Sequence, residues 1–136
     1  MKKRLSLRLL ASALLALPFL TTACQESLEE KCAKECRQYT EKNCPARLEA
    51  NLIIDSLTFD AATHTLKYYY TLTGVADSVG LLSRDEVRQA LIKELRNTTM
   101  MRTYKNADYN FSYIYHSERR PELVLFQETL TARDYK

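Results

Sequence analysis

The 136-residue sequence contains only two glycines, three prolines and two histidines, and it has no tryptophan. So little glycine and proline argues against a disordered or low-complexity chain. No glycine-rich phosphate loop, nucleophile elbow or H-E-x-x-H motif is present. His64 and His116 lack the flanking ligands typical of a metal site. These absences exclude the enzyme classes that short motifs reveal, and nothing in the sequence predicts a cofactor or a metal.

One apolar run is present, and it lies at the N-terminus. Residues 9–20 form an almost entirely apolar block that follows the basic residues Lys2, Lys3, Arg4 and Arg8. The block is within the roughly 7–15 residues of a signal-peptide core and shorter than the roughly 20 that a membrane-spanning helix needs. Residues 1–23 are therefore predicted to be a secretion signal.

The signal ends in the segment Leu20-Thr21-Thr22-Ala23-Cys24, which resembles a lipobox, the motif of bacterial lipoprotein precursors. The resemblance implies that Cys24 receives a diacylglycerol and becomes the acylated first residue. It also implies a membrane-lipid partner, because two or more acyl chains anchor a protein firmly. Gln25 follows where an Asp would resemble an inner-membrane retention signal, which favours the outer membrane. A plain signal peptide with an incidental cysteine and an uncleaved membrane anchor are the alternatives.

The formal charge of +3 belongs to the signal segment. Four of the 20 basic residues and none of the 17 acidic residues precede Cys24, so residues 24–136 carry a net charge of −1. This near-neutral balance gives no electrostatic case for a nucleic-acid partner.

The pattern of the remaining residues predicts an α+β fold. Residues 25–43 read as a charged helix with an apolar stripe that ends before Pro45. Ser83 with Glu86 marks the start of a second helix, which is expected to end between Asn97 and Thr99. Alternation predicts strands over residues 51–60, 65–73, 107–116 and 122–131. The order helix–strand–strand–helix–strand–strand predicts two hairpins in a four-stranded antiparallel sheet, with the helices packed on one face.

Three cysteines remain after Cys24: Cys32, Cys36 and Cys44. Their C-x3-C-x7-C spacing matches neither a C-x2-C redox pair nor a zinc ribbon. The exported location permits disulfides. Cys32–Cys36 and Cys36–Cys44 are both candidate bridges, and either leaves an odd thiol. Intermolecular pairing, a catalytic or metal-binding thiol, and simple packing are the alternatives.

The nine tyrosines are the oddity of the composition. Five of them fall on strand faces that are expected to face the core, where packing explains them: Tyr68, Tyr70, Tyr109, Tyr113 and Tyr115. Tyr69 is then expected on the opposite face, and it is the best single candidate for a binding surface.

Two short motifs, Asp55-Ser56-Leu57 and Asp77-Ser78-Val79, resemble the O-glycosylation motif of some anaerobic diderm bacteria. Ser78 is the better acceptor candidate because it lies in a predicted loop.

The sequence thus predicts a signal peptide (residues 1–23), a lipidated N-terminus with a charged helix (24–45) and a small α+β domain (46–136). The body resembles small uncharacterised envelope lipoproteins, a resemblance that brings no known activity. We expect a non-enzymatic module that binds a protein or a cell-wall component. An accessory subunit of a larger membrane complex and an enzyme with an unfamiliar site are the alternatives.

The anchor can be tested by the substitution Cys24→Ala. Without the thiol no diacylglycerol can be attached, so the precursor should keep its signal peptide and lose its firm membrane attachment. Globomycin, which inhibits the lipoprotein signal peptidase, should also block processing. Gel mobility and membrane fractionation report both effects, and unchanged processing in both cases would overturn the lipoprotein prediction.

Overall fold

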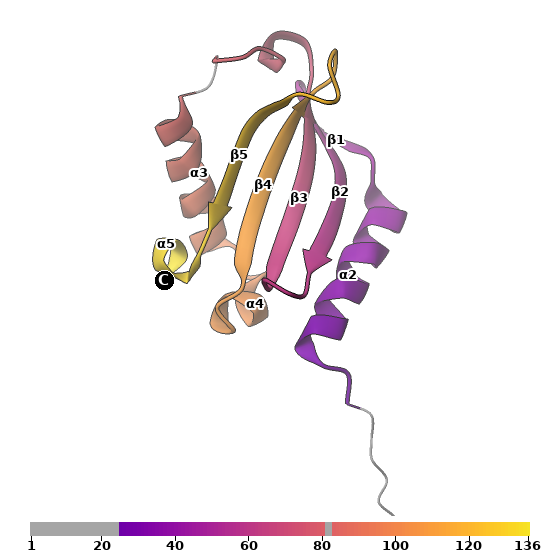
Figure 1. Cartoon of the computed structure of the whole chain (residues 1–136), viewed down its shortest axis with the longest axis vertical. Helices are drawn as coiled ribbons and strands as arrows, with labels where there is room; N and C mark the ends of the chain where they lie inside the picture. Colours follow the sequence, from indigo (N-terminus) through magenta and orange to yellow (C-terminus); the bar gives the residue numbers. More distant parts are fainter. Residues whose placement is uncertain (1–24, 81–82) are drawn as a thin grey trace, which may run out of the picture.

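The structure is a computed structural model that describes residues 25–80 and 83–136 (Figure 1). The signal peptide and Cys24 lie outside the described residues. The described residues form helices and one five-stranded sheet, which confirms the α+β class. The elements are α2 (Leu28–Asn43), β1 (Ala46–Glu49), β2 (Leu52–Asp60), β3 (Thr65–Leu72), the 3-10 helix η3 (Gly74–Ala76), α3 (Arg84–Asn97), α4 (Arg102–Asn106), β4 (Asn110–Ser117), β5 (Val124–Leu130) and α5 (Ala132–Tyr135).

The predicted sheet of four antiparallel strands is wrong in two respects. The strand order is β1-β2-β3-β4-β5, and β3 pairs with β4 in parallel, from Thr65 opposite Asn110 to Leu72 opposite Ser117. The chain between β3 and β4 passes through α3 and α4, and such a crossover returns it to the starting end of β3, as parallel pairing requires. The additional strand, β1, has four residues and too little alternation to be recognised in the sequence.

Helix α2 begins with a capping box. The Glu30 amide donates to the Ser27 hydroxyl and the Ser27 amide donates to the Glu30 carboxylate, each at 3.1 Å. This cap places the first helical residue at Leu28 instead of residue 25. The predicted apolar stripe is confirmed, since Cys32 and Cys36 are the buried residues of the helix. The stripe rests on β2, so α2 is packed on the sheet.

Helix α3 has the predicted boundaries, with the Ser83 hydroxyl accepting from the Glu86 amide and the last helical residue at Asn97. Leu82, at the start of this segment, lies outside the described residues. Helix α4 is not predicted by the residue pattern, because a helix of five residues is too short to show a period.

The hydrophobic core lies between one face of the sheet and helices α2 and α3 (Figure 1). Its largest fully buried side chains are Phe111, Leu66, Leu130 and Cys32. Tyr69, Ser112, Ile114 and His116 alternate with the core-facing residues and lie on the opposite face.

A buried carboxylate joins the loop after β3 to the turn between β4 and β5. Asp77 is 3% exposed and accepts from the Arg119 amide at 3.0 Å and from Arg119 Nε at 3.1 Å. A hydrogen bond from Ser117 and the Arg119 contacts lower the pKa of Asp77 below its usual value. This contact stabilises the fold only while Asp77 is ionised.

The substitution Asp77→Asn tests this contact. Because the pKa of Asp77 is lowered in the folded state, its stabilising contribution is present above pH ~4, the usual range of an aspartate, and disappears as the pH falls through the folded-state pKa. The midpoint of urea unfolding should therefore fall less steeply between pH 5 and 3 in Asp77→Asn than in the unaltered protein. The control is Glu122→Gln, an exposed carboxylate of the same turn. Equal acid sensitivity of Asp77→Asn and the unaltered protein would contradict the assignment.

Candidate functional site

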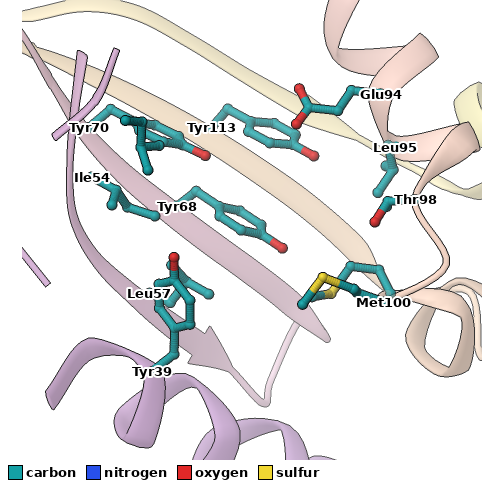
Figure 2. Close-up of a pocket in the computed structure, with 12 residues that line it drawn as sticks. Tyr39, Ile54, Leu57, Tyr68, Tyr70, Glu94, Leu95, Thr98, Met100 and Tyr113 are labelled. Carbon is teal, nitrogen blue, oxygen red and sulfur yellow. The ribbon is translucent and has the colours of Figure 1, made fainter. Parts of the chain in front are cut away.

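An apolar cleft of about 280 Å³ opens between α2 and α3 over the middle of the sheet (Figure 2). Strands β2, β3 and β4 form its floor, and the two helices form its walls. The segment that joins α3 to α4 closes one end. The lining residues are Tyr39, Leu48, Ile54, Leu57, Tyr68, Tyr70, Glu94, Leu95, Thr98, Met100, Met101 and Tyr113. We call this the tyrosine cleft.

Stacked tyrosines form the floor of the tyrosine cleft. The parallel register places Tyr68 opposite Tyr113 and Tyr70 opposite Tyr115. Their ring centroids are 5.1 Å and 4.8 Å apart, with interplanar angles of 10° and 15°. Aromatic pairs at these separations attract each other beyond the effect of buried area alone. The floor is therefore a rigid aromatic surface.

The floor also carries polar groups. Figure 2 shows the hydroxyls of Tyr68, Tyr70 and Tyr113 pointing toward the side on which α3 lies. None of these three hydroxyls makes a side-chain hydrogen bond with another described residue. Removal from water raises the pKa of each phenol well above its usual value. The hydroxyls thus stay protonated and can each donate a hydrogen bond to a bound molecule.

The rim combines exposed apolar side chains with one acid. Met100 is 81% exposed and Leu48 is 49% exposed, so both apolar side chains are available to contact a bound molecule. Glu94 of α3 lies beside Tyr113 (Figure 2), and among the ion pairs between described residues none involves it. The rim therefore suits a ligand that is mostly apolar and carries a positive charge.

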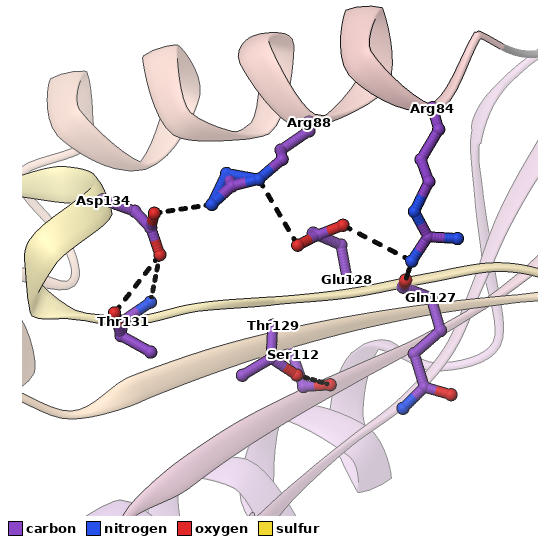
Figure 3. A network of polar contacts seen from close by, with 8 residues as sticks. All are labelled: Arg84, Arg88, Ser112, Gln127, Glu128, Thr129, Thr131 and Asp134. Carbon is purple, nitrogen blue, oxygen red and sulfur yellow. Dashed lines mark hydrogen bonds and ion pairs between the residues drawn. The ribbon is translucent and has the colours of Figure 1, made fainter.

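A polar network holds the α3 wall against the sheet (Figure 3). Arg88 binds Asp134 of α5 at 2.6 Å, and its Nε lies 3.5 Å from the carboxylate of Glu128 on β5. Arg84 donates to the carbonyl of Gln127 at 2.9 Å. The side chains of Arg88 and Glu128 are 29% and 15% exposed, so salt screens this pair less than a surface pair.

The α2 wall is fixed by the side chain of Thr40. Strand β1 covers β2 only as far as Ile54, which leaves the backbone of Leu57 on an open edge. The Leu57 amide donates to the Thr40 hydroxyl at 2.8 Å, and that hydroxyl donates to the Leu57 carbonyl at 3.0 Å. Nearer the N-terminus of the same helix, the Glu35 carboxylate accepts a hydrogen bond from the Tyr104 hydroxyl of α4. Both walls are thus tied to the sheet, and the tyrosine cleft is preformed.

Tyr69, the binding residue expected from the sequence, lies outside the tyrosine cleft. It occupies the opposite sheet face and is half-buried, with its ring 6.4 Å from that of His116. The alternation that points Tyr69 away from the core assigns its neighbours Tyr68 and Tyr70 to core packing. In the structure these two neighbours line an open cleft instead. One feature of the sequence points to this cleft. Tyrosine recurs at successive core-facing positions of two strands, although phenylalanine or leucine would fill a closed core equally well.

The other candidate residues are spread over the fold. Cys32, Cys36 and Cys44 carry free thiols, so the disulfide remains a prediction. His64 packs 5.1 Å from the Tyr109 ring at the far end of β3 from His116. Ser78 is exposed and Ser56 is partly buried. Within residues 25–80 and 83–136, His, Cys, Asp and Glu form no group of three that could hold a metal. No helix in these ranges is long and apolar enough to span a membrane.

Three solved structures share this fold. A protein of Pseudomonas aeruginosa described as secreted has a TM-score of 0.65 at 13% identity, covering 82% of this chain and all of its own. The type II secretion pilotin EpsS of Vibrio vulnificus has a TM-score of 0.63 at 10% identity, covering 79% and 91%. The pilotin AspS of the Vibrio cholerae type II secretion system has a TM-score of 0.58 at 11% identity, covering 78% and 90%.

Sequence comparison gives the family. No curated protein matches the sequence. Residues 27–126, which run from the cap of α2 into β5 and include all residues that line the tyrosine cleft, match the model of a family described as a domain of unknown function. The chain therefore belongs to the DUF8479 family.

Proposed function

We propose that this protein is a lipid-anchored, non-enzymatic component of the bacterial cell envelope, held at the outer membrane through acylated Cys24. It works as an accessory subunit of a larger membrane-associated complex and binds a segment of a partner protein in the tyrosine cleft. The observation that carries the proposal is the preformed aromatic cleft with an exposed apolar rim and an acid without an ion-pair partner among the described residues.

The chemistry of the tyrosine cleft favours an amphipathic helix as the bound segment. Grooves between helices commonly take a third helix through its apolar stripe. Met100 and Leu48 would contact that stripe, while a lysine or arginine of the partner would pair with Glu94. A cell-wall glycan fits less well, because such a ligand needs many hydrogen-bonding groups and this rim is largely apolar.

The likeness to pilotins supports the role as an accessory subunit. EpsS and AspS are described as pilotins of type II secretion systems, and each is nearly fully covered by this fold. A secretion-type membrane complex is accordingly the class of assembly that we propose for the partner.

The position of the anchor fits this role. Only residues 25–27 separate Cys24 from the first residue of α2. Four residue steps span at most ~14 Å when fully extended. The domain would therefore sit close to the membrane surface, within reach of the exposed parts of a membrane complex.

Charge reversal at the rim tests the cleft as the partner site. Glu94→Lys should place a like charge against the basic residue of the partner and weaken binding about tenfold or more, equivalent to ~1.4 kcal/mol. Met100→Glu should act in the same direction by placing a charge against the apolar stripe. Both side chains are exposed, so the fold should be retained. The measurement is quantitative mass spectrometry of proteins that co-purify from the native membrane in mild detergent.

The control is Tyr69→Ser on the opposite sheet face, which should keep the complex. Loss of the complex in Tyr69→Ser with retention in both cleft variants would overturn the site. A clean monomer from the unaltered protein would count against the accessory-subunit role.

A further inference from the structure

Sulfur atoms gather in a second cavity beside the tyrosine cleft. This cavity, of about 190 Å³, lies between α2 and the segment that joins α3 to α4, and it shares Tyr39, Leu57 and the two methionines with the cleft. The described residues include five that carry sulfur, and four of them line the cavity: Cys32, Cys36, Met100 and Met101. We call it the sulfur pocket.

The two thiols of the sulfur pocket lie side by side. Cys32 and Cys36 are one helical turn apart on α2, so their side chains lie on the same face of the helix, and the two residues are 0% and 3% exposed. Both are free. Core packing explains a single buried cysteine, but it does not require two adjacent thiols on the wall of a cavity that two thioethers also line.

The other lining groups narrow the choice of ligand. The pocket is lined by no histidine, and its one carboxylate, Glu35, already accepts a hydrogen bond from Tyr104. Zn²⁺ prefers four ligands drawn from cysteine, histidine and carboxylate, which this pocket does not offer. Thiolates and thioethers together select a soft ion, of which Cu(I) is the biological example.

We propose that the sulfur pocket binds one Cu(I) ion through the thiolates of Cys32 and Cys36 and the thioether of Met100 or Met101. Binding forms two Cu–thiolate bonds and releases the two thiol protons to solvent, while no electron is transferred. A Cys32–Cys36 disulfide is the competing state: its formation removes two electrons and two protons, and it leaves no thiolate for the metal. Cu(I) binding therefore requires the reduced pair.

The methionines connect this site to the molecular surface. Met100 is 81% exposed and Met101 is partly buried, so one thioether can meet an incoming ion while the thiols remain covered. The site needs no partner protein, so metal binding and the proposed partner binding can succeed or fail separately.

The test is an anaerobic titration of the full-length, fully reduced protein in detergent with Cu(I), against the chromogenic competitor bicinchoninate. The unaltered protein should withdraw one Cu(I) per chain. Cys32→Ser and Cys36→Ser should each weaken binding at least 100-fold, and the double variant Met100→Leu/Met101→Leu should weaken it about tenfold. Cys44→Ser, the matched control, should bind as the unaltered protein does. Circular dichroism checks that each variant is folded.

X-ray absorption at the copper edge needs no variant and gives a second readout. A first coordination shell of sulfur alone is expected in the unaltered protein. Failure of the reduced protein to compete for Cu(I), nitrogen or oxygen in the first shell, or equal loss of binding in Cys44→Ser would each overturn the proposal.

Discussion

The parallel pairing of β3 with β4 is the contact on which the rest of the structure depends. Because the two strands run in the same direction and in register, Tyr68 meets Tyr113 and Tyr70 meets Tyr115 across the same ladder. Antiparallel pairing would reverse β4 and separate these rings. The crossover that parallel pairing requires also places α3 on the same sheet face as α2, and the tyrosine cleft is the space left between the two helices.

Short polar contacts hold both walls of the cleft in place, in addition to the apolar side chains that α2 and α3 bury against the sheet. Thr40 satisfies the open edge of β2 on one side, while Arg88 joins α3 to β5 and α5 on the other. A preformed cleft lowers the entropic cost of binding, since the protein does not have to be ordered when the ligand arrives. The same helix, α2, follows the predicted lipid anchor, so the anchor and one wall of the cleft are parts of one element.

Residue patterns predict the local structure of this chain, but they do not predict how distant strands pair in the sheet. Alternation correctly assigned Tyr68 and Tyr113 to the core face, and the Ser83 cap correctly placed the start of α3. Alternation has no direction, however, so it could not show that β4 runs parallel to β3. The cleft could not be predicted either. In the sequence, Glu94 looks like an ordinary solvent-exposed acid of a helix, and only the fold shows which side chains lie across from it. The sulfur pocket joins residues 32 and 36 to residues 100 and 101, a proximity that sequence spacing does not contain.

The central claim is that the partner binds over the tyrosine cleft and not on the opposite sheet face. The most direct measurement places a photo-crosslinking amino acid at Met100 in one version of the protein and at Tyr69 in another, and irradiates living cells that express each. A cross-linked protein adduct from position 100, absent or much weaker from position 69, is the expected result. An adduct from position 69 with none from position 100 would contradict the assignment of the cleft.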